Sequence, residues 1–293
     1  MSLLTEPFAY EFFRQGLFAS LLVGALCGML GVYIVLRRMS YIGHGLSHSV
    51  FGGAVVAYVA SINFYVGAGL WGFFSALLIN FTARRRRIGA DAAIGIVTTA
   101  SFAIGVALIS KTRSFTRNFE AALFGNILGV TPTDLIIVAA VTAAVALFIL
   151  LFYKRLLFMT FDPEVAPIYG INVGAVDSLF ALAMAATIVA SINVVGVTLI
   201  AATLVIPSTT ARLLTDSFAR MIVLSTAIGA SSGAIGMYLS YWLDVSSGAT
   251  IVLLEAGIFV AVFLGATLTH RRSSWAGQPS RGLVRDRLDS DGA

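Results

Sequence analysis

The chain has 293 residues, of which 58% are hydrophobic and only 11% are charged, and its formal net charge at pH 7 is +5. Soluble domains carry about 25% charged residues, so this composition and a mean hydropathy of +0.93 exclude a soluble globular protein. Several uncharged stretches reach the roughly 18–20 residues that a helix needs to cross a bilayer, and they are continuous rather than alternating. The sequence therefore predicts an all-α, polytopic membrane bundle and not a β-barrel. Because the basic residues gather in short loops, we expect a lipid bilayer and not a nucleic acid as the partner of this charge.

An N-terminal interfacial segment (1–16), with a short helix over residues 6–15, is predicted to precede a transmembrane domain (17–270). We expect about eight or nine spans. The predicted spans cover residues 17–36, 43–63, 66–82, 92–110, 134–153, two helices within 178–211, 221–243 and 249–269. The last residues, 271–293, are polar with mixed charge and are predicted to form a disordered tail.

The uncharged run 178–211 contains 34 residues and is too long for one ordinary span. Asn193 and Gly196 lie near its middle, so we split it into two helices joined by a tight turn. Pro207 is expected to kink the second helix.

Two segments between the spans are not apolar enough to cross the membrane. Residues 111–133 look irregular, with a short helix over 123–129 lying at the surface or dipping partway in. Residues 154–172 are amphiphilic and are expected to form a loop.

The basic residues predict the orientation of the chain. In a nine-span topology nearly all of them fall on one side, which the positive-inside rule assigns to the cytoplasm. They are Arg37, Arg38, Arg84 to Arg87, Lys154, Arg155, Arg212, Arg220, Arg271 and Arg272. This places the C-terminal tail in the cytoplasm and the N-terminus outside the cell membrane (plasma or inner membrane).

His44 and His48 are the most informative residues of the chain, which has only three histidines. Four residues apart on a helix, both imidazoles lie on one face. Neutral imidazole is a common divalent-metal ligand, and an ionisable pair inside a membrane segment indicates a functional site. The alternative is that both are interfacial residues with satisfied hydrogen bonds.

Glu255 is the exceptional carboxylate inside an apolar span. It could join the histidines as a hard ligand or proton acceptor, or it could be a neutral side chain bonded to a neighbouring helix. Cys27 is the only cysteine, so a cysteine metal cluster is excluded. Two imidazoles with carboxylate or backbone oxygen suit Zn²⁺, Mn²⁺ or Fe²⁺, and this pattern does not decide among them.

The chain contains no Gly-x-x-x-x-Gly-Lys-[Ser/Thr] phosphate loop, so it is not expected to bind ATP in that manner. The stretch from His44 to His48 superficially resembles the zinc-protease pattern His-Glu-x-x-His. Gly45 occupies the position of the catalytic glutamate, however, which argues against a protease. We expect no enzyme and no resident cofactor.

The chain resembles the membrane permease subunits of bacterial ABC importers for zinc, manganese or iron. Four blocks carry the resemblance and together span residues 15–268. The first three blocks are RMSYIGHGLSHS (38–49), DAAIGIV (91–97) and LFGNIL (123–128). The fourth combines FDPE (161–164), the stretch that begins with VGVTL (195–199) and continues to Pro207, and SGATIV (247–252).

This resemblance implies a helical fold like that of the vitamin-B12-type importers and a homodimer with its pathway on the two-fold axis. It implies two cytoplasmic ABC ATPase subunits and an extracytoplasmic metal-binding protein as partners, with a divalent metal ion as substrate. The family's ATPase-coupling segment maps onto residues 161–170. Its candidate residues are Phe161, Asp162, Pro163, Glu164, Tyr169 and Gly170. The alternative for this segment is a solvated loop in which Asp162, followed by Pro163, caps the N-terminus of a helix.

One departure from the family pattern concerns the metal site. Family members commonly carry aspartate where this chain has His44, whereas His48 matches the pattern. A His/His pair is softer than an Asp/His pair, so the identity of the metal and the role of His44 stay open. Asp91, Asn193 and Pro207 are further candidates for the pathway or its gate. The alternative to an ABC permease is a self-contained metal-ion channel or secondary carrier.

Overall fold

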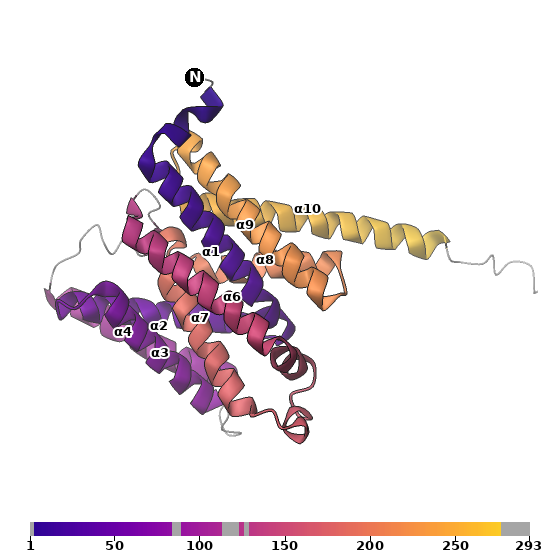
Figure 1. The fold of residues 1–293 in the computed structure, drawn as a ribbon, viewed down its shortest axis with the longest axis horizontal. Helices are drawn as coiled ribbons and strands as arrows, with labels where there is room; N and C mark the ends of the chain where they lie inside the picture. The colour runs from indigo at the N-terminus through magenta and orange to yellow at the C-terminus, as the bar shows by residue number, and fades with distance from the viewer. Residues whose placement is uncertain (1–2, 84–88, 113–122, 126–128, 277–293) are drawn as a thin grey trace, which may run out of the picture.

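The computed structural model describes residues 3–83, 89–112, 123–125 and 129–276, and within them it is helical with no strand (Figure 1). The elements are η1 (Leu3–Ala9), α1 (Glu11–Leu36), α2 (Ser40–Val59), α3 (Phe64–Ala83), α4 (Ala90–Thr112), α6 (Pro132–Phe161), η3 (Ala166–Tyr169), α7 (Val173–Val195), α8 (Ile200–Leu214), α9 (Phe218–Leu243) and α10 (Ser247–Ala276). The predicted all-α membrane bundle is confirmed.

Seven of the described helices are long and apolar enough to cross a membrane, and α2 and α8 are the remaining two α-helices of that part of the chain. Helix α8 has 15 residues. At 1.5 Å per residue it spans about 22 Å, less than the roughly 30 Å of a hydrocarbon core. Helix α2 carries the two histidines and several serines in its first half, which lowers its hydropathy.

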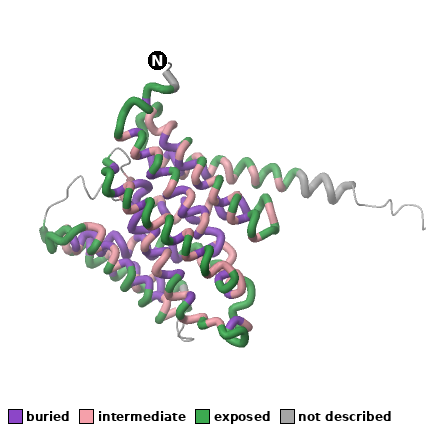
Figure 2. Tube along the Cα trace, viewed as in Figure 1, coloured by how far each residue is buried: buried purple, intermediate pink, exposed green. Residues whose placement is uncertain are grey.

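The helices differ in how much protein surrounds them. In α1 and α7 the most apolar window is 67% buried, whereas the corresponding windows of α6 and α10 are 17% and 11% buried (Figure 2). Figure 1 shows α1 and α7 running through the middle of the bundle, while the second half of α10 extends away from the other helices. Because the side chains on α6 and α10 are nonetheless apolar, their open faces suit contact with lipid.

Helices α1 and α9 approach each other closely and run antiparallel. A Cβ atom on Gly24 would collide with the backbone carbonyl of Gly229, and one on Gly28 would collide with that of Ser225. The hydroxyl of Ser225 donates a hydrogen bond of 2.6 Å to the carbonyl of Gly28. Small residues at these positions therefore let two backbones touch, and a hydroxyl then bonds across the contact.

The N-terminal region differs from the prediction. Residues 6–15 do not form a separate interfacial helix, because η1 ends at Ala9 and α1 already begins at Glu11. The reason is Phe13, which is fully buried and packs edge-on against Tyr238 and Tyr241 of α9 at ring-centroid distances of 6.3 and 5.5 Å. This contact with α9 stabilises the first turns of α1.

Helix α6 is longer than predicted, since it continues to Phe161 instead of ending at residue 153. Leu156 and Met159 lie three residues apart and are both buried, so packing in the core stabilises two further helical turns. The preceding basic pair, Lys154 and Arg155, indicates a loop there. Helix α10 continues to Ala276, beyond the predicted end at 269. The rest of the predicted tail, residues 277–293, lies outside the described residues, as do residues 126–128 of the predicted short helix.

The predicted division of the run 178–211 is confirmed. Helix α7 ends at Val195 and α8 begins at Ile200, with Gly196 at φ +86° between them. A side chain at Gly196 would meet the backbone of Leu123 to Gly125, which packs against this turn. Thr198 donates both its N–H and its hydroxyl to the carbonyl of Leu123, at 3.3 and 2.7 Å. The glycine is therefore required both for its left-handed conformation and for space.

Replacing Gly24 with alanine should lower the thermal stability of the purified protein, because the added methyl group meets a backbone carbonyl that cannot rotate away. Overpacking of this kind costs about 1–3 kcal/mol. Thermal unfolding in detergent measures the effect. Gly257→Ala is the control, since nothing lies within 4 Å of a Cβ there. Equal melting temperatures for the two variants would contradict the close contact of α1 and α9.

Candidate functional site

The two histidines of α2 lie side by side on one face of the helix, as predicted. Their ring centroids are 4.6 Å apart and the rings meet edge to face at 78°. The His44 side chain is exposed and that of His48 is half-buried. Each neutral imidazole has one unprotonated ring nitrogen with a lone pair, so the pair offers two neighbouring nitrogen ligands of the kind that divalent cations take.

Glycines hold the histidine-bearing end of α2 against two neighbouring helices. A Cβ on Gly45 would collide with Ile94 and Thr98 of α4, and one on Gly43 would press on Leu204 of α8. The His48 ring packs edge-on against Phe102 of α4, with centroids 5.0 Å apart. This packing fixes the orientation of His48, whereas His44 projects from the open side.

His48 Nδ1 is buried and has no hydrogen-bond partner in the described part of the chain. A buried ring nitrogen without a partner is costly. The described residues supply no hydrogen bond to this nitrogen, whereas the interfacial alternative expects satisfied hydrogen bonds at both histidines.

Glu255 does not join the histidines. It is fully buried, and neither carboxylate oxygen has a hydrogen-bond partner among the residues described. Its electrostatic neighbour is the thiol of Cys27 in α1. Within the described ranges, no three His, Cys, Asp or Glu side chains gather into a group that could hold a metal ion. The chain therefore offers two imidazoles at one place and an isolated carboxylate at another.

Asn193 lies in a polar cluster that joins α3, α6 and α7. Its side-chain amide donates to the Tyr65 hydroxyl at 3.0 Å and to Asp134 Oδ1 at 3.3 Å. Tyr65 in turn donates a hydrogen bond to the same carboxylate oxygen. Asp134 Oδ2 accepts from the backbone N–H and the hydroxyl of Thr131, both at 2.8 Å. Asn193, a predicted pathway residue, is thus part of a hydrogen-bond network that joins the start of α3, the start of α6 and the end of α7.

The sequence interpretation missed Asp134 and Tyr65. Asp134 carries a local signal, because Thr131 and Asp134 have the spacing of a capping box with Pro132 at the first helical position, and the structure shows that box. Nothing local indicates that Tyr65 and Asn193, 69 and 59 residues from Asp134, complete the cluster.

The other two pathway candidates lie apart from this cluster. Asp91 is exposed in the first turn of α4, where a carboxylate interacts favourably with the helix dipole. Pro207 is buried inside α8, which continues through it to Leu214.

The predicted coupling segment, residues 161–170, is an exposed loop between α6 and α7. Its large apolar side chains face outward, with Phe161, Ile168 and Tyr169 exposed by 63%, 81% and 69%. The buried Ala166 anchors it, and Gly170 at φ +73° ends its short 3₁₀ helix. Asp162 does not cap the N-terminus of a helix as the alternative supposed; it is the C-terminal cap of α6. Pro163 and Glu164 are exposed beside it.

Residues 9–266 match the family model described as the ABC 3 transport family. The chain belongs to the ABC 3 transport family. It is 39% identical over 255 residues to the manganese transport system membrane protein MntC of Halalkalibacterium halodurans, covering 87% of each chain. It is 34% identical over 266 residues to the chelated iron transport system membrane protein YfeC of Yersinia pestis, covering 91% of this chain and 90% of the relative.

A solved structure described as PsaBC from Streptococcus pneumoniae in complex with Fab superimposes on this ABC 3 chain with a TM-score of 0.79 and 34% sequence identity. The match covers 87% of this chain and 91% of that one. The predicted resemblance to ABC-transporter permeases and the predicted helical permease fold are therefore confirmed. This ABC 3 protein is a multi-pass membrane protein of a transport system.

Replacing Asp134 with alanine should destabilise the protein, because Tyr65, Asn193 and Thr131 all lose an acceptor. Each buried polar group left without a partner costs about 1–3 kcal/mol. Thermal unfolding in detergent is the measurement. Asp244→Asn serves as the control, since Asp244 is exposed with φ +53°, a conformation that asparagine tolerates. An unchanged melting temperature for Asp134→Ala would refute the structural role of the cluster.

Proposed function

We propose that this chain is the permease subunit of an ATP-driven importer of a divalent metal ion, with Mn²⁺ or Fe²⁺ as the leading cargo and Zn²⁺ as a further one. The observation that carries the proposal is the His44–His48 pair, in which an exposed imidazole lies next to a half-buried one on one face of a helix in an ABC 3 scaffold. The manganese and chelated-iron transport relatives support a metal ion as the substrate.

The chemistry of the pair suits transient binding of a passing cation. Two nitrogen ligands occupy only part of a coordination sphere that needs four or more positions. Water, or groups from a second copy of the chain, would fill the others. An incomplete site binds weakly enough to release the ion, which conduction requires. Glu255 is fully buried and forms no group with the pair among the described residues, so we assign Glu255 no ligand role.

The arrangement of basic residues supports a cytoplasmic coupling segment. Arg37 at the end of α1 bonds Thr160 at the end of α6, so the two helix ends lie on the same side. The turn between α8 and α9 is also there, because Phe218 packs against Phe161 at 6.0 Å. Lys154, Arg155, Arg212 and Arg220 are therefore near the same end. By the positive-inside rule this end faces the cytoplasm, in the plasma or inner membrane.

The remaining assembly follows from this orientation. The exposed apolar side chains of residues 161–170 would seat in a groove of a cytoplasmic ABC ATPase, which hydrolyses ATP while this chain performs no catalysis. A second copy of the chain would form the other half of the pathway. An extracytoplasmic metal-binding protein would deliver the ion at the opposite end, where Asn193, Tyr65 and Asp134 lie.

Replacing His48 with alanine should reduce ATP-dependent Mn²⁺ uptake by the assembled transporter in liposomes by at least about tenfold, since losing even a group that merely supports a metal ligand costs 10–100-fold. His270→Ala is the matched control, because His270 is the third histidine of the chain and lies near the C-terminus. Uptake by His48→Ala equal to that of the control would remove His48 from the pathway. Uphill uptake without any ATPase would favour a self-contained carrier.

Replacing Ile168 with glutamate should weaken co-purification of the ATPase subunit, because a charge on the most exposed apolar side chain of the loop opposes burial in a groove. The control is Ile62→Glu. Ile62 is also an exposed loop isoleucine, but it follows α2 and lies at the other end of that helix. Equal recovery of the ATPase with both variants would contradict docking at residues 161–170.

A further inference from the structure

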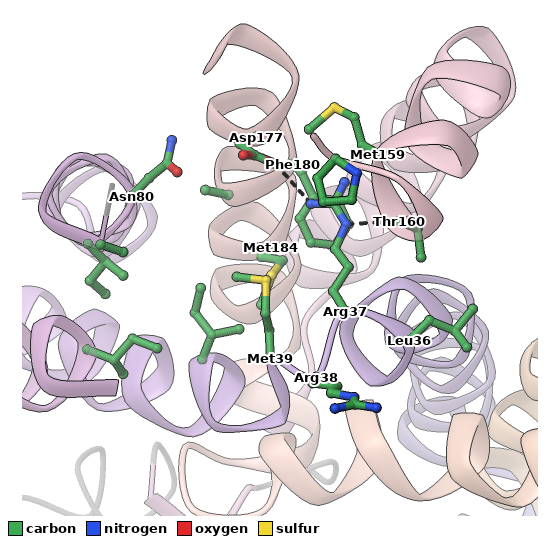
Figure 3. Close-up of a pocket in the computed structure, with 16 residues that line it drawn as sticks. Leu36, Arg37, Arg38, Met39, Asn80, Met159, Thr160, Asp177, Phe180 and Met184 are labelled. Atoms are coloured by element: carbon green, nitrogen blue, oxygen red, sulfur yellow. Dashed lines mark hydrogen bonds and ion pairs between the residues drawn. The ribbon is translucent and has the colours of Figure 1, made fainter. Parts of the chain in front are cut away.

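A cavity of about 330 Å³ lies beside the coupling segment, among six helices (Figure 3). Its wall comes from the turn between α1 and α2, the end of α3, the start of α4, the end of α6 and the first half of α7. Three methionines line it: Met39, Met159 and Met184. Unbranched thioether side chains adapt to changes of shape, so the cavity can alter its volume without breaking a rigid core.

Arg37 crosses one side of this cavity and bonds two helices at once (Figure 3). Its Nη1 lies 3.0 Å from Asp177 Oδ1 of α7, and its Nε donates to Thr160 Oγ1 of α6 at 3.4 Å. Its guanidinium lies 4.9 Å from the centre of the Phe180 ring. The Arg37 side chain is 9% exposed and that of Asp177 is 27% exposed. A charge pair this sheltered from water is screened less than a surface pair.

The partners of Arg37 bracket the coupling segment. Thr160 is the residue directly before Phe161, in the last turn of α6, and Asp177 lies in the first turns of α7. Arg37 therefore holds the two helices that flank residues 161–170, one on each side of the segment.

Arg37 also stands directly before the helix that carries the histidine pair. It follows the last residue of α1, and α2 begins at Ser40 after Arg38 and Met39. Arg38 has φ +56°, an uncommon conformation for a residue with a side chain, so the turn is sharply bent and short. A shift of Arg37 is passed to the start of α2 through two intervening residues.

We propose that Arg37 is a positioning residue that links the coupling segment to α2, so that ATPase-driven movement of residues 161–170 reaches His44 and His48. This inference rests on the proposed function. The fork of the guanidinium holds α6 and α7 to the α1–α2 turn, and the methionine-lined cavity gives the turn room to move. Arg37 acts through α2 and does not contact the ion.

The test uses the complete transporter in liposomes and measures both ATP hydrolysis and Mn²⁺ uptake. Arg37→Gln should reduce Mn²⁺ transported per ATP hydrolysed by about fivefold or more, the lower range of coupling between distant sites. ATP hydrolysis itself should persist. Arg37→Lys should recover part of the lost Mn²⁺ transport per ATP hydrolysed, because lysine keeps the positive charge but lacks the planar guanidinium that bonds two partners at once. A ratio unchanged in Arg37→Gln would overturn the proposal.

Asp216→Asn is the matched control, because Arg212 and Asp216 form an ion pair that is 46% and 99% exposed and does not face the cavity. It should leave the ratio unchanged; a loss equal to that of Arg37→Gln would overturn the proposal, since any arginine–aspartate pair would then have the effect.

Two further variants keep the test decisive if Arg37→Gln fails to fold. Thr160→Val removes one acceptor and leaves the ion pair intact, so a folded protein with a reduced ratio supports the link. The exchange of Arg37→Asp with Asp177→Arg restores the opposite charges and should recover transport relative to either single change. Two results together would reject the link. They are a Thr160→Val protein that keeps the wild-type ratio of Mn²⁺ transported to ATP hydrolysed, and an exchange variant that transports no better than either single variant.

The two proposals fail in different ways. If the wild-type assembly shows no ATP-dependent metal uptake, the proposed function is wrong. If the wild type transports and hydrolyses ATP while all Arg37 variants keep its ratio, only the role of Arg37 is wrong.

Discussion

The close contact of α1 with its neighbours is the constraint on which the rest of the structure depends. Gly24, Gly28 and Gly31 line α1 where a Cβ would collide with the backbone of α9 or α8. In a bilayer the hydrophobic effect does not press helices together, so close van der Waals packing and hydroxyl bonds must do so. The hydroxyl of Ser225 donates such a bond to the carbonyl of Gly28. The hydroxyl of Ser208 lies 3.0 Å from the hydroxyl of Ser225. Helix α1 is thereby fixed along its length.

A fixed α1 determines where the chemistry lies. Its end places Arg37 between α6 and α7, and the short turn that follows places α2 against α4 and α8. The same principle of small residues recurs in α2, where Gly43 and Gly45 let the helix approach Leu204 and Ile94. His48 consequently packs on Phe102 and His44 stays open. The asymmetry between the two imidazoles is thus a consequence of packing on one side of α2.

Local patterns predicted the elements but not the contacts between distant ones. Apolar length, Gly196 and the histidine spacing were enough to place the helices, the break after α7 and the shared face of His44 and His48. The end of α6 could not be predicted, because Lys154 and Arg155 suggest a loop while burial of Leu156 and Met159 depends on tertiary neighbours. For Glu255 the sequence leaves two interpretations open, a ligand beside the histidines or a neutral side chain bonded to a neighbouring helix, and only the fold shows that it stands apart from the pair without a hydrogen-bond partner among the described residues.

Polar anchors hold α7 to its neighbours at both of its ends. Asp177 bonds Arg37 near the start of α7, and Asn193 bonds Tyr65 and Asp134 near its end, 16 residues later. That separation is about 24 Å at 1.5 Å per residue. Between the anchors α7 is mostly apolar, and Asn80 of α3 donates a hydrogen bond of 2.9 Å to the Ser178 hydroxyl. The two anchors and this bond hold α7 to α1, α3 and α6, so one helix joins the end that bears the coupling segment to the opposite end of the bundle.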